Sequence, residues 1–286
     1  MGIEREVFDY VNKSKTNVDG MNVLKMESVH ELAKKLNKSI KQTELYLLEQ
    51  NILPYRYIGT AKFTGLQGMI RLLKSRVAII GCGGVGGFIC ELCARLGVGE
   101  IILFDGDVYE ESNINRQIGC IEKNIGKYKA EVMADRIKDI NSGVEVFYKN
   151  TYLQKPHFTT ELSGCDVIID SVDNIQDRLN ISNACKELMI PFIHGSIGNS
   201  SIHVGVSMPD NNFLENIYSY NNTNNKLMGS PVTTVMICAA LQVAELVKII
   251  CEIGESLSGY LLHYNWLSND LIKIDFSNNN DKGGQI

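Results

Sequence analysis

From Arg76 onward the chain alternates short apolar runs with longer amphipathic stretches, and this is its most regular pattern. Short apolar runs bounded by turn residues predict strands, and apolar positions three and four apart predict helices. The expected strands lie at 76–80, 100–105, 144–148, 165–170 and 191–195. The expected helices lie at 85–96, 126–140, 174–188 and 231–252. Regular alternation of strands and helices favours an α/β fold around a mostly parallel sheet.

The end of the chain departs from this alternation. Residues 201–208 alternate between apolar and polar positions, and further strands are expected at 259–265 and 270–276. These strands predict an antiparallel extension of the sheet. Residues 209–230 are polar and rich in asparagine, so we expect a long loop there, of the kind that is usually functional or disordered.

The N-terminal part has a pattern of its own. Residues 1–26 show no clear periodicity, whereas 27–50 predict two helices separated at Asn37–Ser39. Few lysines support a DNA-binding role for this small helical unit, so a packing arm or a clamp for a partner is favoured. We therefore divide the chain into an N-terminal arm or clamp, 1–52, and a larger domain, 53–286. A linker and a short helix are expected at 60–75.

Composition narrows the class of protein. The chain has 286 residues, 44% of them apolar, which is enough for one large domain and a small one. A net charge of −5 gives no basic surface for nucleic acid, so no nucleic-acid partner is expected. No apolar stretch is expected to reach the length that a membrane span needs, and the N-terminus lacks the order of a signal peptide. Eight cysteines, mostly in apolar segments, favour a reduced, cytoplasmic protein.

A glycine-rich turn follows the first strand of the large domain. Residues 81–86 read Gly-Cys-Gly-Gly-Val-Gly and lead directly into a predicted helix. Glycines at such a turn let the backbone approach a phosphate, and the free N–H groups of the helix favour an anion. Asp105 ends the next strand 24 residues after Gly81, about where a nucleotide-binding fold places an acid on the ribose. The chain is therefore predicted to bind a nucleotide.

Further polar residues follow the strands at the edge where parallel sheets bind ligands. Arg116 and Lys129 suit phosphate oxygens and developing negative charge, and Asp173 suits Mg²⁺. A nucleotidyl-transfer enzyme needs both features, whereas a hydride-transfer enzyme needs neither. The candidate nucleotide-binding residues are Gly81, Gly83, Gly84, Gly86, Asp105, Asp107, Asn113, Gln117 and Asn174.

Together these motifs resemble the ThiF/MoeB/HesA adenylyltransferases, which are bacterial relatives of ubiquitin-activating enzymes. The resemblance covers about residues 53–276 and implies a Rossmann-like fold. The motifs that carry it are residues 81–86, 103–108, 112–117, 126–129, 173–178 and 228–231.

The resemblance implies a reaction and a role for each motif residue. Members of the family use ATP and Mg²⁺ to adenylate the C-terminal Gly-Gly carboxylate of a small ubiquitin-like sulfur carrier, with release of pyrophosphate. Members are also homodimers in which an arginine near the N-terminus reaches the partner's phosphates, and Arg56 is the candidate here. The implied contacts are Gly83 with the nucleotide, Asp105 with the ribose, Asn113 and Arg116 with phosphate, Lys129 with the pentavalent phosphorus, and Asp173 with Mg²⁺.

Two departures from the family pattern concern cysteine. Many members hold a structural zinc with two Cys-x-x-Cys pairs, but Cys90 and Cys93 form the only such spacing here, so no zinc site is expected. Some members carry a reactive cysteine in a loop across the active site, and 209–230 contains none. We therefore expect the enzyme to stop at the acyl-adenylate and to rely on a separate sulfur donor.

Other functions remain open on the sequence. Related enzymes adenylate the C-terminus of a peptide or a carboxylate on a tRNA base, and the N-terminal unit would suit a peptide clamp. The acidic net charge argues mildly against tRNA. A non-catalytic scaffold subunit is disfavoured because Arg116, Lys129 and Asp173 are all present. A nicotinamide dehydrogenase would bind NAD and show no pyrophosphate chemistry.

Overall fold

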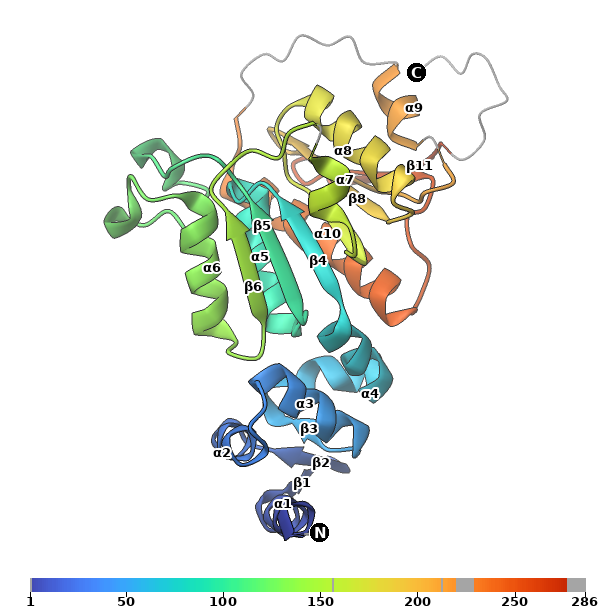
Figure 1. The fold of residues 1–286 in the computed structure, drawn as a ribbon. Coiled ribbons are helices and arrows are strands. Elements are labelled where there is room, and N and C mark those ends of the chain that lie inside the picture. Colours follow the sequence, from blue (N-terminus) through green and yellow to red (C-terminus); the bar gives the residue numbers. More distant parts are fainter. Residues whose placement is uncertain (1, 156, 212, 220–228, 277–286) are drawn as a thin grey trace.

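The computed structural model describes residues 2–155, 157–211, 213–219 and 229–276, which form a small N-terminal unit and a large α/β domain (Figure 1). The N-terminal unit contains a three-stranded sheet in the order β1-β2-β3. Its elements are α1 (Gly2–Ser14), β1 (Thr16–Val18), β2 (Met21–Leu24), α2 (Met26–Leu36), α3 (Ile40–Glu49) and β3 (Leu53–Pro54). Figure 1 shows this unit beyond one end of the large sheet, where α4 (Ile58–Lys74) leads into β4 (Arg76–Ile80).

The large sheet has eight strands in the order β11-β10-β9-β8-β7-β4-β5-β6. From β8 through β7, β4 and β5 to β6, neighbouring strands pair in parallel. From β8 through β9 and β10 to β11, they pair antiparallel. The predicted α/β, Rossmann-like fold with a mostly parallel sheet and an antiparallel extension is thus confirmed. The strands besides β4 are β5 (Glu100–Phe104), β6 (Glu145–Lys149), β7 (Val167–Asp170), β8 (Phe192–Gly198), β9 (Ser201–Ser207), β10 (Tyr260–Asn265) and β11 (Asp270–Asp275).

Helices cover both faces of this sheet. Val77 and Ile79 of β4 are fully buried against one apolar cluster, and Ala78 and Ile80 point into another. Because both faces are covered, the central strands are apolar at almost every position. One cluster takes side chains from α5 (Gly84–Leu96), α6 (Lys129–Ile140) and α10 (Val232–Cys251), and the other from α7 (Phe158–Leu162), α8 (Ile175–Glu187) and α9 (Phe213–Ser219).

Several element boundaries differ from those expected. The first turn of α6 begins at Lys129, not at 126, because Gly126 has φ +82° and Lys127 belongs to a turn. In place of the linker and short helix expected at 60–75, one helix, α4, continues to Lys74, with a break at Gly65, where φ is +71°. Helix α9 lies within the expected loop 209–230, of which 212 and 220–228 are outside the described residues.

The N-terminal unit contains more structure than its sequence pattern indicated. Helices α2 and α3 are confirmed, with Asn37 in the left-handed region between them and Ser39 capping α3 through Gln42. Helix α1 and the hairpin β1–β2 were not expected. Strand β3 pairs in parallel with β2, so the pairing of this unit extends to Pro54, while the division of the chain at 52/53 stays a prediction. The unit has its own apolar core, made by Val7, Val11, Leu24, Val29, Leu32, Leu47 and Ile52.

A buried ion pair joins the N-terminal unit to the large domain. The Glu44 carboxylate is fully buried and lies 3.2 Å from Arg56 Nε, while the Tyr57 hydroxyl donates to it at 3.0 Å. Arg56 Nη1 also donates to Asn141 Oδ1, at the end of α6, at 2.6 Å. Burial raises the pKa of Glu44 to about 6, although Arg56 and Tyr57 oppose the shift. The junction therefore contains a carboxyl group that folding holds partly protonated near pH 6.

We expect Glu44→Gln to remove a pH dependence from folding. Because the pKa of Glu44 is raised in the folded state, its stabilising contribution to the free energy of unfolding is complete below pH 4.5. It is lost as the pH rises through about 6. The difference between the unfolded-state and folded-state pKa values corresponds to about 2 kcal/mol. Urea unfolding should show the wild type losing about 2 kcal/mol relative to Glu44→Gln between about pH 4 and about pH 7.5. Glu49→Gln, on the exposed face of the same helix, is the control. Parallel pH profiles for the wild type and Glu44→Gln would contradict the assignment.

Helix α10 corrects one expectation about the sequence. This helix of 20 residues is long enough and apolar enough on average to cross a membrane, so a stretch of that length does exist. The helix packs against β8, β9, α4 and α5, and 56% of its most apolar 18-residue stretch is buried inside the protein. Core helices of globular proteins share this length and apolar composition, and the packing of α10 is that of a core helix.

Candidate active site

The glycine-rich turn joins β4 to α5 at the carboxyl end of the sheet. Gly81 has φ +94°, its N–H donates to Phe104 O at 2.8 Å, and its carbonyl accepts from the Ser171 hydroxyl at 2.9 Å. A Cβ on Gly86 would lie 1.9 Å from Gly81 O, so the turn closes only with glycine there. Helix α5 begins at Gly84, whose predecessor Gly83 is its N-cap. The open N–H groups of this helix start are suited to a phosphate.

Asp105 and Asp107 follow β5 beside this turn. Asp105 is nearly buried, and its two oxygens accept from the N–H groups of Cys82 at 2.6 Å and Asp107 at 2.8 Å. Burial raises the pKa of Asp105, against the effect of those two hydrogen bonds. Asp107 pairs with Lys129 Nζ at 2.8 Å. Partial burial raises the pKa of Asp107, but the hydrogen bonds from Lys129 and Tyr152 outweigh it and leave the pKa below its usual value.

Tyr152 completes this group, and sequence reasoning missed it. It follows β6, and its hydroxyl donates to the Asp107 carboxylate while its ring lies against Gly106. That hydrogen bond raises the pKa of Tyr152 to about 12, and Asp105, Asp107 and Asp173 all add to the shift. Tyr152 thus links the segment after β6 to the Asp107 carboxylate. Its place just after a parallel strand was the available signal.

The polar segment after Asp107 has mixed roles. Arg116 is half-buried, and its Nη1 donates to Ser112 O at 2.8 Å and Asn115 Oδ1 at 2.9 Å. Asn113 is buried and accepts from Glu110 N at 3.2 Å, which caps a turn. The Gln117 amide faces Gly83, and its buried Oε1 has no hydrogen-bond partner among the described residues. Gln117 thus presents an unsatisfied polar group beside the glycine-rich turn.

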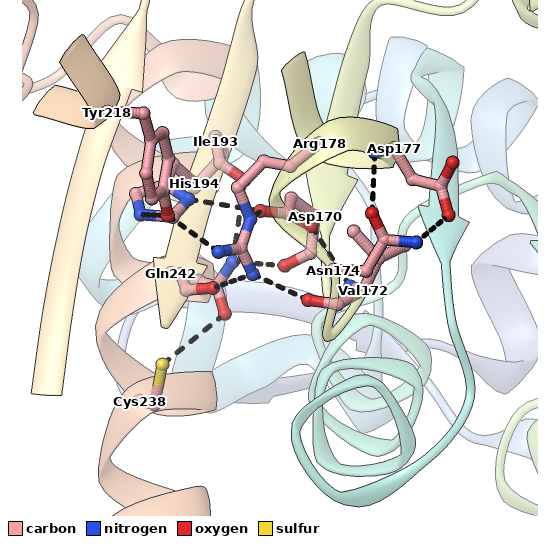
Figure 2. A network of polar contacts seen from close by, with 11 residues as sticks. Asp170, Val172, Asn174, Asp177, Arg178, Ile193, His194, Tyr218, Cys238 and Gln242 are labelled. Atoms are coloured by element: carbon pink, nitrogen blue, oxygen red, sulfur yellow. Dashed lines mark hydrogen bonds and ion pairs between the residues drawn. The ribbon is translucent and has the colours of Figure 1, made fainter. Parts of the chain in front are cut away.

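Asp173 lies in the turn between β7 and α8 (Figure 2 shows the neighbouring residues). Its side chain is exposed and has no hydrogen-bond or ion-pair partner within the described part of the chain. Asn174 caps α8 by accepting from Asp177 N at 2.9 Å. The turn thus begins a capped helix directly after an unpaired carboxylate.

Strand register brings most of the predicted residues to one edge. Ile80 pairs with Phe104 on one side and with Asp170 on the other, so the turns that follow β4, β5 and β7 lie together. Arg56 is not among them. It lies next to Tyr57, which packs on Gly97 after the last turn of α5, whereas the glycine-rich turn begins that helix. The two ends of α5 are about 20 Å apart. Action of Arg56 at a partner's site stays a prediction.

Mg²⁺ fits the donors at this edge. The ion takes hard oxygen ligands and usually uses one or two carboxylates together with substrate phosphates. The free carboxylate of Asp173 offers such a ligand, and Asp107 follows β5, which lies on the other side of β4 from β7. Among the described residues, no group of three or more His, Cys, Asp and Glu side chains forms a complete cage for an ion. The residues therefore suit a metal that arrives with the nucleotide.

All eight cysteines are buried free thiols. Cys90 and Cys93 lie in the core on α5, as predicted. Burial raises the pKa of Cys238 to about 12, which keeps that thiol protonated at neutral pH. None of these thiols is placed as an exposed nucleophile.

Comparison with known proteins gives a family and several relatives. The model of the ThiF family matches residues 56–284. The SAMP-activating enzyme E1 of Haloferax volcanii is 28% identical over 222 residues, which is 76% of this chain and 82% of that protein. A probable molybdopterin-synthase adenylyltransferase of Porphyra purpurea is 32% identical over 70% of this chain and 54% of that protein. A tRNA threonylcarbamoyladenosine dehydratase of Haemophilus influenzae is 34% identical over 48% and 53%. The chain thus spans about half the length of the last two relatives.

Among solved structures, Escherichia coli MccB crystallised with ATP shares the fold. The TM-score is 0.66 at 20% identity, over 95% of this chain and 88% of that one. Since so little of this chain is left out, the similarity must include most of the N-terminal unit as well as the large domain.

Proposed function

This chain belongs to the ThiF family, and we propose that it uses ATP and Mg²⁺ to adenylate the C-terminal carboxylate of a polypeptide, releasing pyrophosphate. One observation carries the proposal. The glycine-rich turn, the Lys129–Asp107 pair and the free carboxylate of Asp173 meet at the carboxyl ends of β4, β5 and β7. This combination suits a triphosphate and its metal, and a nicotinamide cofactor needs neither the lysine nor the free carboxylate.

Each residue has a physical task in this reaction. The glycine-rich turn lets the backbone approach the phosphates, and the remaining lone pairs of Asp105 can accept from ribose hydroxyls. Lys129 and Arg116 offset the negative charge that builds up as the carboxylate approaches the α-phosphate. Asp173 and Asp107, from the turns after β7 and β5, would hold Mg²⁺, which supplies further charge neutralisation on the phosphates. No general base is required, because the attacking carboxylate is ionised at neutral pH.

The preferred substrate is a small ubiquitin-like sulfur carrier that ends in Gly-Gly. The names of two relatives, an activating enzyme and an adenylyltransferase, support this choice. The buried cysteines support a separate sulfur donor, since no exposed thiol is present among the described residues to take over the acyl group. We also propose a cytoplasmic homodimer in which Arg56 serves the partner's site. The name of a third relative keeps a carboxylate on tRNA as a less favoured alternative.

A second candidate substrate is a peptide, and the N-terminal unit favours it. The unit has its own core and packs at the end of the sheet away from the glycine-rich turn. Strand β1 is the outer strand of its sheet, and Thr16 and Asn17 are exposed. An open strand edge can take up an extended peptide as an added strand. A bound leader segment at this edge would leave the peptide's C-terminus free to reach the nucleotide.

ATP–pyrophosphate exchange with Mg²⁺ distinguishes these substrates. We expect exchange only when a carrier protein with a free Gly-Gly terminus, or a peptide with a free C-terminus, is added. The matched control is the same polypeptide with a C-terminal amide, which cannot be adenylated. Exchange with one carrier identifies the substrate, and exchange with peptides alone establishes the second candidate. ATP binding without exchange from any polypeptide would contradict the proposed reaction and indicate a scaffold subunit, and binding of NAD in place of ATP would indicate a dehydrogenase.

A further inference from the structure

A buried polar network surrounds Asp170, three residues before Asp173 in the chain (Figure 2). At its centre, Asp170 at the end of β7 is fully buried and accepts from Arg178 Nε at 2.5 Å and from His194 Nδ1 at 3.0 Å. Burial raises the pKa of Asp170, but Arg178 and His194 outweigh that effect and keep the pKa below its usual value. Gln242 of α10 donates to Asp170 O at 2.7 Å. Side chains from α8, β8 and α10 therefore converge on Asp170, those from α8 and β8 on its carboxylate and that from α10 on its backbone carbonyl.

This network fixes the residue that precedes Asp173. The Val172 N–H donates to Asp170 Oδ1 at 3.0 Å, and Val172 O accepts from Arg178 Nη2 at 2.5 Å. On the other side of Asp173, Asn174 begins α8 as its N-cap. The backbone on both sides of Asp173 is thus held, while its carboxylate stays free. Such an arrangement preorganises a ligand without occupying it.

Tyr218 connects the same network to α9. Its hydroxyl accepts from Arg178 Nη1 at 2.6 Å and lies 3.4 Å from His194 Nε2. Burial lowers the pKa of His194, so the ring is neutral, and its Nδ1–H is assigned to Asp170. His194 Nε2 is then an acceptor for the Tyr218 proton. Every donor and acceptor in this chain of contacts has one consistent role.

We propose that Arg178 and Tyr218 are positioning residues for Asp173, and that docking of α9 through Tyr218 sets how well Asp173 binds Mg²⁺ with the nucleotide. This inference rests on the proposed function, in which Asp173 holds the metal. Arg178 acts through the Val172 carbonyl, and Tyr218 acts by holding the guanidinium in place. Neither side chain needs to touch the metal or the substrate.

The remaining contacts of α9 allow a clean test. Phe213 and Leu214 are fully buried, and Glu215 pairs with Lys186 at 2.5 Å. Removing the Tyr218 hydroxyl should therefore leave α9 folded while breaking its link to Arg178. Tyr10→Phe is a matched control, because that hydroxyl also donates one hydrogen bond, to Glu31 at 2.7 Å, within the N-terminal unit.

The measurement is Mg²⁺-dependent binding of ADP to the full chain. We expect Tyr218→Phe to raise the Mg²⁺ concentration for half-maximal binding by about threefold to tenfold, the effect of one hydrogen bond. Binding at saturating Mg²⁺ should recover, and Tyr10→Phe should behave as the wild type. Hydrogen exchange in α9 should slow on addition of Mg²⁺ and ADP in the wild type and change less in Tyr218→Phe. An unchanged Mg²⁺ requirement in Tyr218→Phe would overturn the proposal.

A double-mutant cycle separates this inference from the proposed function. If Tyr218 acts through Asp173, Tyr218→Phe should have no further effect on the Mg²⁺ requirement in an Asp173→Asn background. Additive effects would overturn the coupling while leaving Asp173 as a metal ligand. An Asp173→Asn protein with a wild-type Mg²⁺ requirement would instead remove the metal role of Asp173 on which both proposals depend.

Discussion

Asp173→Asn is expected to lower ATP–pyrophosphate exchange by about 1,000-fold, the range seen when one preorganised electrostatic contact is removed from an active site. The substitution keeps the size of the side chain and removes its negative charge, which a hard divalent cation needs. Because the carboxylate is exposed and has no partner among the described residues, the fold should be unaffected. Thermal unfolding should show a change within about 0.5 kcal/mol, as for an ordinary surface position.

Asp135→Asn is the matched control for this variant. Asp135 is exposed on α6 and lies 3.4 Å from Lys138, away from the strand ends that carry the candidate site. Its exchange activity should equal that of the wild type. If Asp173→Asn retained activity within about tenfold of the wild type, the assignment of Asp173 to the metal would be wrong, because loss of a preorganised charge costs more than that.

The strands of the parallel core could be predicted from the sequence because strands buried on both faces are apolar at almost every position. Residues 76–80 form β4 as predicted, and the side chains from Val77 to Ile80 are all buried. Because parallel strands end at a common edge, the polar residues after them could be grouped without knowing the fold in detail. The proximity of the turns after β4, β5 and β7 follows from that argument and is present in the structure.

The missed features depend on contacts between segments far apart in the sequence. Tyr152 is related to Asp107 only through the folded sheet, since 45 residues separate them. Strand β1 has only three residues, which are mostly exposed, so its sequence shows no alternation of apolar and polar positions. Arg56 illustrates the same limit, because its buried partner Glu44 belongs to a helix that the sequence describes only by its apolar face. Local pattern predicts elements, whereas pairing of polar side chains requires the tertiary arrangement.

Gly86→Ala is expected to disrupt the glycine-rich turn and abolish nucleotide binding. A Cβ there would lie 1.9 Å from Gly81 O and 2.4 Å from Ser171 Oγ, and the first of these is a backbone atom that cannot rotate away. Alanine would favour the helix by about 1 kcal/mol over glycine. Overpacking typically costs about 1–3 kcal/mol and sometimes more, and a 1.9 Å contact with a backbone atom belongs at the upper end, so the steric effect should win. Thermal unfolding should show a lower stability than that of the wild type, and ADP binding should be lost.

Gly59→Ala provides the matched control for this steric argument. Gly59 lies in helix α4, and a Cβ there would meet nothing within 4 Å. The same substitution should therefore be neutral or stabilise the protein by up to about 1 kcal/mol, with normal ADP binding. A Gly86→Ala protein that unfolds and binds ADP like Gly59→Ala would show that the turn can relax. The close approach of Gly86 to Gly81 would then not explain why glycine occupies this position.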